Sequence, residues 1–337
     1  MEKLLTVIIP TYNMQDYLCR CLDSLVVRPN LMDILEVLVI NDGSKDDSSV
    51  IAHSYQDRIP GSFRVIDKAN GHYGSCVNRG LAEATGKYIK VLDADDWFDT
   101  SELEKLLEKL PSVDADLILT SYKIVDNKGK TIGIVKQKVN SGEVFDFNSN
   151  PAPYVTSYAM YMVTWRTELL RRINYVQTEG INYTDTEWRC IPLYEVGKCV
   201  YYSFCIYHYL LGRIGQSSED VVMNRNVWQF ETCVMSLIHN RARYNVKDYP
   251  LANRENEYAI LMYALNIYKI ILIRKKATEE DLSHLKKFDD YLHESCPEVW
   301  KKAGEHTAKK WLPIKYIEYW RKTGRVFSLN WMRRKRQ

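Results

Sequence analysis

The chain has 337 residues, of which 46% are hydrophobic and 26% are charged. These proportions are ordinary for a globular protein and exclude a largely disordered chain, and the length allows one α/β domain with an appended element, or two domains. The formal net charge of +3 lacks the clustered basic excess of a nucleic-acid-binding protein. The 24 tyrosines suit either a wet groove for a ring-shaped polar ligand or ordinary packing.

The eight cysteines include no Cys-x-x-Cys pair, so the sequence does not indicate a zinc site. The first apolar run begins at Leu4, which leaves no room for a secretory signal, and no window reaches the roughly 18 continuous apolar residues of a membrane span. We therefore expect reduced thiols in a cytoplasmic protein.

Strands and helices are expected to alternate through the first third of the chain. Apolar runs of strand length occur at residues 4–9, 35–40, 63–66 and 88–92. Helical patterns lie between them, the first ended by Pro29, the second capped by Ser44 and the third spanning Gly74 to Ala84. This alternation predicts right-handed crossovers and a mainly parallel sheet.

Polar motifs follow three of these strands where each strand ends. They are Pro10–Asn13, Asn41–Ser44 and Asp93–Asp95. In open α/β sheets, ligands bind beyond the carboxyl ends of the strands, so three motifs at one edge predict a binding site. Neither a Gly-x-x-x-x-Gly-Lys-Ser/Thr loop nor a Gly-x-Gly-x-x-Gly loop is present, which disfavours a P-loop nucleotidase and a dinucleotide dehydrogenase.

Asp93 and Asp95 are two residues apart at the end of the strand 88–92. If the backbone is still extended there, both carboxylates project from the same face. Carboxylate oxygens suit Mg²⁺ or Mn²⁺, and a site with few protein ligands leaves room for substrate phosphates. Taken alone, Asp-x-Asp is weak evidence, because the pattern recurs in turns and helix caps.

These motifs, with Asn70-Gly71, Asn78–Leu81 and Ala84–Gly86, resemble the ordered motifs of family 2 glycosyltransferases, which have the GT-A fold. The resemblance covers residues 4–215 and implies metal-dependent, inverting transfer of a sugar from a nucleotide donor, usually a UDP-sugar. It implies that Pro10, Thr11, Tyr12 and Asp42 hold the uracil and ribose, Asp93 the ribose or sugar, and Asp95 the metal. A turn at Pro10 and a helix cap at Asp42 are the alternatives.

The sequence departs from the family motifs in places. Many members have Ala-Arg-Asn where this chain has Cys76-Val-Asn78. Arg79 is the possible substitute for the missing arginine, but it comes one residue after Asn78, a rotation of about 100° on a helix. His72 lies in a glycine-rich loop near the same edge, where a sugar contact and an exposed loop histidine are both open.

The second half contains the expected acceptor site. A helix capped by Ser101 and a hairpin around residues 127–130 are expected first. The segment Gly180–Trp188 resembles the family's Glu-Asp segment, with Thr184 in place of the Glu, so Asp185 is the first candidate for the general base and Glu187 the second. A simple helix cap by Thr184 or Asp185 is the alternative.

The segment 207–217 resembles the strand and loop that close over the diphosphate. There Arg213 is expected to pair with phosphate, with an ordinary surface arginine as the alternative. Apolar stripes from Asn226 onward predict helices that form packing surfaces or an oligomer interface. From Tyr316, seven basic residues face a single Glu318 between aromatic residues, which suits an anionic membrane surface as well as a solvated tail.

We therefore predict an α/β GT-A fold, Rossmann-like, with a mainly parallel sheet, helices on both faces and a C-terminal helical extension. The expected catalytic domain is 1–220, divided into a nucleotide half 1–98 and an acceptor half 99–220, followed by a helical region 221–337. The candidate site residues are the catalytic Asp185 and Glu187, the metal ligands Asp93 and Asp95, and the donor-binding Pro10, Thr11, Tyr12, Asn13, Asp42, Ser44, Asn78, Asp93, Ala94 and Arg213.

The predicted function is transfer of a sugar from a UDP-sugar to a glycan, glycolipid or glycoprotein with Mn²⁺ or Mg²⁺ as cofactor, in the cytoplasm or at the inner membrane face. A sugar nucleotidyltransferase and a non-catalytic nucleotide-sugar binder are the alternatives. The first of these would need a glycine-rich basic loop after the first strand, and Pro10–Asn13 offers none.

Overall fold

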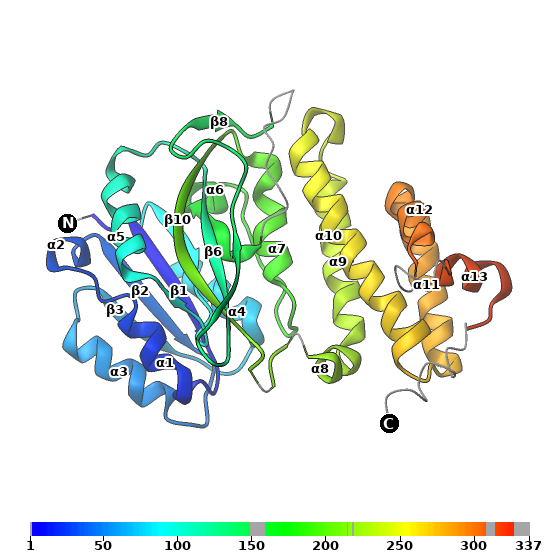
Figure 1. The fold of residues 1–337 in the computed structure, drawn as a ribbon, viewed down its shortest axis with the longest axis horizontal. Helices are drawn as coiled ribbons and strands as arrows, with labels where there is room; N and C mark the ends of the chain where they lie inside the picture. The colour runs from blue at the N-terminus through cyan, green and yellow to red at the C-terminus, as the bar shows by residue number, and fades with distance from the viewer. Residues whose placement is uncertain (1, 149–158, 214, 218, 308–313, 327–337) are drawn as a thin grey trace. The chain divides into compact units, whose positions relative to one another are not determined.

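The computed structural model describes residues 2–148, 159–213, 215–217, 219–307 and 314–326. The chain forms two compact units (Figure 1). Unit 1 consists of residues 1–214 and 247–252, and unit 2 consists of residues 215–246 and 253–337. The predicted functional division at residue 220 stays a prediction.

Unit 1 is built on a ten-stranded sheet in the order β3-β2-β1-β4-β9-β6-β10-β5, with β7 paired to β6 and β8 to β10. The strands β1 to β4 are parallel to one another, as are β6 and β10, and the other pairs are antiparallel. The strands are β1 Leu5–Thr11, β2 Leu35–Asn41, β3 Phe63–Asp67, β4 Tyr88–Val91, β5 Trp97–Phe98, β6 Leu117–Asp126, β7 Thr131–Val135, β8 Val144–Asp146, β9 Val163–Arg166 and β10 Lys198–Leu211.

The helices of unit 1 pack on both faces of this sheet because β1 is apolar on both sides. Leu5, Val7 and Ile9 belong to a core that also contains the inward residues of α1 and α5. Ile8 points the other way, toward α4, where a Cβ on Gly80 would lie 2.6 Å from it. The helices are α1 Gln15–Asp23, α2 Pro29–Met32, α3 Ser48–Arg58, α4 His72–Glu83, α5 Thr100–Lys109, α6 Thr167–Arg172 and α7 Asp185–Cys190, with short 3-10 helices at Leu110–Ser112, Met160–Met162, Ile191–Glu195 and Val246–Asp248.

The predicted fold class is confirmed, and three details of the expected helix ends are wrong. α1 ends at Asp23, and Pro29 begins α2, where its missing N–H costs nothing. Ser44 does not cap α3, which begins at Ser48. Ser101 lies inside α5, whose cap is the Asp99 carboxylate accepting from the Glu102 amide.

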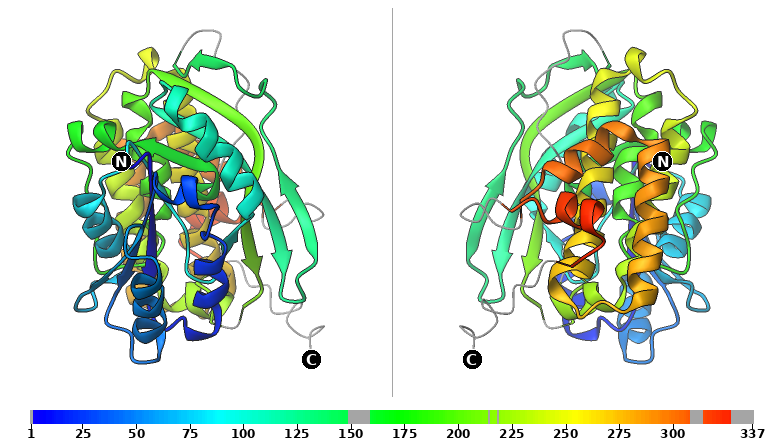
Figure 2. Two further views of the ribbon diagram at one scale, coloured as in Figure 1. Left: turned by 90° about the vertical axis from the view of Figure 1, so that its left-hand side faces the viewer. Right: turned by 90° about the vertical axis from the view of Figure 1, so that its right-hand side faces the viewer.

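Unit 2 is helical, as the extension was predicted to be (right view of Figure 2). The stripe that includes Val227, Phe230 and Val234 is buried, while Tyr258 and Met262 of the second stripe are exposed. No helix in the described parts of the chain is long and apolar enough to cross a membrane. The helices are α8 Asp220–Arg225, α9 Val227–Arg241, α10 Pro250–Lys269, which begins in unit 1 and is followed by the π-helical Ile270–Arg274, α11 Glu279–Ser295, α12 Pro297–Glu305 and α13 Tyr316–Thr323.

Candidate active site

The carboxyl ends of β1, β2 and β4 lie together at one edge of the sheet. Thr11 is opposite Asn41 in the register of β1 and β2, and on its other side β1 places Ile8 opposite Val91 of β4. The amide of Asp42 donates to the Thr11 carbonyl oxygen over 2.8 Å, which joins the two loops where their strands end. The prediction that the three polar motifs share one edge is therefore confirmed.

The loop after β1 is held by the loop after β2. The Asn13 amide donates to Ser44 Oγ over 3.0 Å, and the Lys45 amide donates to Asn13 Oδ1 over 2.8 Å. Asn13 has a φ of 53°, a left-handed conformation that asparagine tolerates better than most residues. The Tyr12 ring between these anchors is 45% exposed at the sheet edge, where a planar base can stack on it.

Three other residues that were predicted to bind the nucleotide-sugar donor present mainly backbone atoms at this edge of the sheet. The Thr11 side chain is buried and its hydroxyl donates to the Ile9 carbonyl oxygen over 3.1 Å. Pro10 is half-buried, and Ala94 is buried between the two aspartates. Their predicted roles would therefore depend on carbonyl and amide groups rather than on side-chain chemistry.

Asp42 is buried and paired with a cation that the sequence reasoning missed. Lys68 Nζ lies 2.5 Å from Asp42 Oδ1 and also donates to Ser75 Oγ over 2.8 Å. The Gly71 amide donates to the same carboxylate oxygen over 2.9 Å. The buried charge of Asp42 is thus balanced by Lys68 where β2 and β3 end.

The arginine missing from the Ala-Arg-Asn motif is not replaced by Arg79. Val77 occupies the motif position and is fully buried, while Arg79 pairs with Glu83 one turn along α4, 2.8 Å away. Lys68 therefore supplies the positive charge nearest to Asp42 among the described side chains. A signal was present in the sequence, because Lys68 follows the end of β3 and so lies at the same edge as the motifs.

Three carboxylates gather beyond the end of β4. Oxygens of Asp93, Asp95 and Asp96 all lie within 4.8 Å of one another. Asp96 is held most firmly, since its Oδ2 accepts from the Tyr207 hydroxyl and its Oδ1 from the Leu210 amide, each over 2.7 Å. Asp96 therefore anchors β10 to the cluster, a role that its position beside Asp95 did not reveal.

The two predicted metal ligands each accept one side-chain hydrogen bond in the described structure. Asp93 Oδ1 accepts from the Tyr73 hydroxyl over 2.9 Å. Asp95 Oδ2 accepts from Arg213 Nε over 2.7 Å. Arg20 adds a bond to the Asp95 carbonyl oxygen over 3.1 Å. Tyr73 and Arg213 thus hold the two carboxylates at the sheet edge.

The electrostatics of the cluster favour a bound cation. Burial, followed by the nearby charge of Asp95, raises the pKa of Asp93 to about 7. Burial and the charges of Asp95 and Asp93 also raise the pKa of Asp96 well above its usual value. The positive charge of Arg213 acts in the opposite direction on Asp93 but does not cancel this effect. An all-oxygen site whose carboxylates repel one another fits a hard divalent ion.

Asp185 and Glu187 occupy different environments at the start of α7. Glu187 is fully buried, and its two oxygens accept from the Thr178 amide over 2.8 Å and the Thr178 hydroxyl over 2.7 Å. Asp185 is half-buried in the first turn. The Thr184 side chain makes no cap bond to the helix and instead accepts from Gln177 Nε2 over 2.8 Å, so the helix-cap alternative for it is wrong.

The segment before α7 is fastened to α4, which brings Asp185 toward the carboxylates. A Cβ on Gly74 would lie 1.9 Å from the Thr178 carbonyl oxygen, so only glycine permits this approach. Asn78, which was predicted to contact the donor, is bonded to the Gln177 backbone twice over 2.8 Å and so braces this segment. After burial, the charges of Asp93 and Asp185 both raise the pKa of the Tyr73 hydroxyl, which places Tyr73 near both carboxylates.

A cluster of tyrosines adjoins these acids. The Tyr161 ring stacks on Tyr209 at 4.6 Å and also contacts Tyr207 at 4.7 Å and Tyr122 at 5.2 Å between ring centroids. Burial raises the pKa of Tyr161 well above its usual value, and the charges of Asp93, Asp96 and Asp185 add to this effect. The rings come from β6, β10 and Met160–Met162, and no sequence motif linked them. His72 is exposed at the start of α4.

Comparison with known proteins decides the family. The family model described as "Glycosyl transferase family 2" matches residues 6–170, which contain all three polar motifs of the sheet edge. The chain belongs to glycosyltransferase family 2. This family 2 chain is 33% identical over 128 residues to "Putative glycosyltransferase EpsH" of Bacillus subtilis. That match covers 38% of this chain and 36% of the relative.

Solved structures with the same fold cover more of the chain. The S. aureus TarS 1–349 structure in complex with UDP-GlcNAc has a TM-score of 0.61 at 18% identity and covers 88% of this chain and 82% of that one. The mannosyltransferase PcManGT from Pyrobaculum calidifontis, in complex with GDP-Man and Mn²⁺, has a TM-score of 0.50 at 13% identity and covers 90% and 83%. At these identities the likeness shows the GT-A-like fold.

Proposed function

We propose that this family 2 chain is an inverting, metal-dependent glycosyltransferase that transfers a sugar from a UDP-sugar to a carbohydrate acceptor. The observation that carries the proposal is the group of Asp93, Asp95 and Asp96 at one strand end, with Arg213 bonded to it and Asp185 within electrostatic reach. Such a transfer requires a nucleotide-binding site, here at the sheet edge, together with a cation site and a separate carboxylate.

The donor is proposed to bind along the sheet edge. Tyr12 would stack on the uracil, and Asp42, steadied by Lys68, would accept from the base or ribose. Asn13 and Ser44 would hold the loop that carries Tyr12 rather than contact the donor directly. These roles follow from exposure and hydrogen bonding at the edge, and the UDP-GlcNAc bound by TarS supports the choice of a uridine nucleotide.

Asp93 and Asp95 are the proposed holders of Mn²⁺ or Mg²⁺. When bound, the ion would neutralise charge on the diphosphate of the donor. Arg213 would leave Asp95 and pair with a phosphate oxygen as the leaving group gains charge. The guanidinium can make this exchange because its paired N–H groups bind carboxylate and phosphate alike. The Mn²⁺ in the PcManGT complex supports an ion of this class.

Asp185 is the proposed general base. In an inverting displacement the acceptor hydroxyl attacks from the side opposite the leaving nucleotide, so a carboxylate apart from the cation site must take its proton. Glu187 is poorly suited to this task because both of its oxygens are bound by Thr178. The tyrosines around Tyr161 lie near Asp185 and offer apolar ring surface and hydroxyls for the acceptor sugar.

The predicted membrane contact and the predicted homo-oligomer both concern unit 2. Trp320 and Arg321 of the predicted membrane-binding tail are largely buried within unit 2, so they do not face a lipid surface. Residues 327–337, with most of the predicted basic charge, lie outside the described residues. The exposed Tyr258 and Met262 on α10 support an oligomer contact.

The proposal is tested by supplying UDP-sugars and neutral acceptors to the full chain and analysing the product mass. Asp185→Asn should slow transfer by roughly 10²-fold or more while UDP-sugar affinity stays within a few fold, the usual result of losing a positioned base. Glu168→Gln, an exposed acid on α6, is the matched control. Normal transfer by Asp185→Asn would move the base elsewhere, and a folded but inactive Glu187→Gln would identify it as Glu187.

The same experiment separates the alternative functions. A sugar nucleotidyltransferase would release pyrophosphate from a nucleoside triphosphate and a sugar phosphate, and no UDP would form. A non-catalytic binder would bind UDP-sugars and release nothing. UDP release that depends on an acceptor sugar is the result expected of the proposed transferase.

A further inference from the structure

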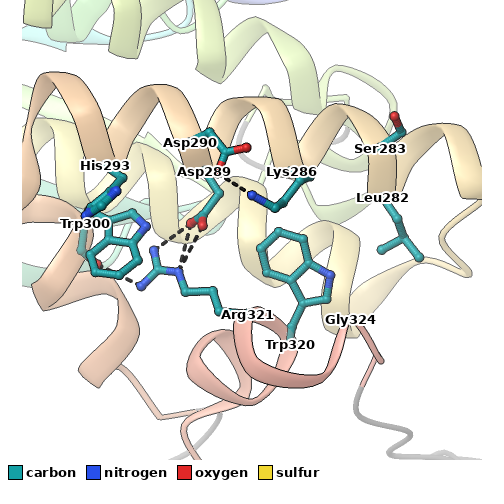
Figure 3. Close-up of a pocket in the computed structure, with 10 residues that line it drawn as sticks. All are labelled: Leu282, Ser283, Lys286, Asp289, Asp290, His293, Trp300, Trp320, Arg321 and Gly324. Carbon is teal, nitrogen blue, oxygen red and sulfur yellow. Dashed lines mark hydrogen bonds and ion pairs between the residues drawn. The ribbon is translucent and has the colours of Figure 1, made fainter.

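Unit 2 contains a pocket of about 440 Å³ that no proposed step of the transfer uses (Figure 3). This volume is in the range of small-molecule sites. α11 forms one wall with residues spaced three or four apart, and α12 and α13 close the other sides. The lining residues are Leu282, Ser283, Lys286, Asp289, Asp290, His293, Trp300, Trp320, Arg321 and Gly324.

The frame of the pocket is built without a ligand. Arg321 donates to Asp289 from Nε over 2.9 Å and from Nη2 over 2.7 Å, and from Nη1 to the Trp300 carbonyl oxygen over 3.0 Å. The Tyr268 hydroxyl also bonds to Asp289. This network ties α13 to α11 and α12. A Cβ on Gly304 would lie 2.7 Å from Arg321 Nη1, so glycine makes room for the guanidinium.

The charges that line the pocket are balanced. Arg321 pairs with Asp289, and Lys286 pairs with Asp290 one helical turn along α11. The first pair is largely buried and fixed, while the second is exposed at the rim and paired only within its own helix. A charged ligand would therefore gain little net attraction, and a neutral ligand with several hydroxyls can exchange hydrogen bonds with the rim pair.

The remaining lining groups are aromatic or neutral and polar. The Trp320 ring stands across the pocket from Lys286 and Leu282, and Trp300 closes its far end (Figure 3). Trp300 Nε1 is buried and has no acceptor among the described residues. The Arg321 guanidinium lies over the Trp300 ring at 4.0 Å and Trp320 is 5% exposed, so the apolar surface that the two rings offer is small. Ser283 adds an exposed hydroxyl at the rim. A small apolar surface beside hydroxyl, carboxylate and ammonium groups suits the mixed surface of a sugar ring.

We propose that this pocket binds a neutral saccharide unit. In the context of the proposed function, on which this part rests, the saccharide would belong to the glycan acceptor or product, so that unit 2 holds a chain on which unit 1 acts. The pocket itself requires only a sugar ring with free hydroxyls.

Binding is tested on the full chain with neutral disaccharides and tetrasaccharides of glucose, galactose, mannose and N-acetylglucosamine. The protein is labelled with fluorotryptophan, and the ¹⁹F signals of Trp300 and Trp320 are assigned with Trp300→Phe and Trp320→Phe. At least one saccharide should shift both signals in a saturable way, without competition from UDP.

Two rim variants locate the effect. Asp290→Ala and Lys286→Met are exposed changes that should weaken saccharide binding by about tenfold or more, because hydrogen bonds to a charged group are lost. Lys287→Met and Glu294→Gln, exposed on α11 outside the pocket, should change binding less than twofold. The absence of a saturable shift with every saccharide, or equal binding by the rim variants, would overturn the proposal.

The experiments distinguish an error in the pocket proposal from an error in the proposed function. If saccharide binds but UDP release does not depend on an acceptor, the pocket proposal stands and the transferase proposal is rejected. Transfer with no saccharide bound at Trp300 and Trp320 would reject the pocket alone. Asp185→Asn should lose transfer and keep the two ¹⁹F shifts.

Discussion

The carboxylate cluster of unit 1 and the pocket of unit 2 both concentrate charged side chains, but only the pocket pairs each charge. In the pocket, Arg321 and Lys286 neutralise Asp289 and Asp290. In the cluster, the one ion pair among the described residues joins Arg213 to Asp95, and burial together with the charge of Asp95 raises the pKa of Asp93 to about 7. A paired network stabilises the fold by itself, whereas unbalanced acids raise the free energy of the unliganded protein and favour a cation.

The largest effect is expected from removing one acid of the unbalanced cluster. Asp95→Ala should lower turnover by roughly 10³-fold or more, because a metal ligand is lost and metal-assisted charge stabilisation contributes several kcal/mol. UDP release measured across Mn²⁺ concentrations checks this result, with the exposed Asp57→Ala on α3 as control. Full activity of the unmodified chain in excess chelator would contradict the metal assignment.

Breaking the paired network should act on stability instead of turnover. Arg321→Ala leaves the buried Asp289 carboxylate without its cation and should lower the free energy of unfolding of unit 2 by roughly 3–5 kcal/mol. Chemical denaturation followed by circular dichroism measures the change. Lys322→Ala on the same helix, whose partner Glu318 is exposed, should have little effect. A similar loss from both variants would show that α13 tolerates no change, rather than that the buried pair matters.

Lys68 makes Asp42 a paired acid inside unit 1. Lys68→Met should weaken UDP binding by about tenfold or more and raise KM with kcat nearly unchanged, since a hydrogen bond to a charged group positions the donor and not the transition state. Calorimetric titration with UDP gives the affinity. The exposed Lys109→Met at the end of α5 serves as control. Unchanged affinity would remove Lys68 from the donor site.

Lys90 is a buried lysine with no carboxylate partner among the described residues, and its effect should appear as a pH dependence. Its Nζ donates to the Tyr161 and Val163 carbonyl oxygens over 2.8 and 3.1 Å, the two bonds that a neutral amine can donate. Burial lowers the pKa of Lys90 from 10.5 to about 7. Between these values the unfolded chain binds more protons, so this residue's contribution to stability increases as pH rises.

Lys90→Met should remove that increase. The difference in unfolding free energy between the unmodified chain and the variant should grow in favour of the unmodified chain between pH 7 and 9, by up to about 1.4 kcal/mol per pH unit. Denaturation curves at several pH values measure it. A difference that stays constant with pH would mean that Lys90 is not neutral in the folded protein.

The sheet edge and most of the residues at it could be predicted from the sequence alone. Continuous apolar runs and the polar residues after them are local properties, so the ends of β1, β2 and β4 could be placed before any contact was known. Helix ends were placed less well. Ser44 is four residues before α3, but its hydroxyl bonds to Asn13 in the neighbouring loop, a partner 31 positions away.

The partners of the acidic side chains at this edge could not be predicted in this way. Lys68, after β3, bonds to Asp42, after the neighbouring strand β2. Tyr73 on α4 bonds to Asp93, and Tyr207 on β10 bonds to Asp96, which is 111 residues away in the sequence. Asp185 and Glu187 look alike in the sequence. In the structure, Thr178 donates to both oxygens of Glu187, whereas Asp185 is half-buried near Tyr73. Such pairings depend on the packing of distant segments, which the periodicity and spacing of residues in the sequence do not predict.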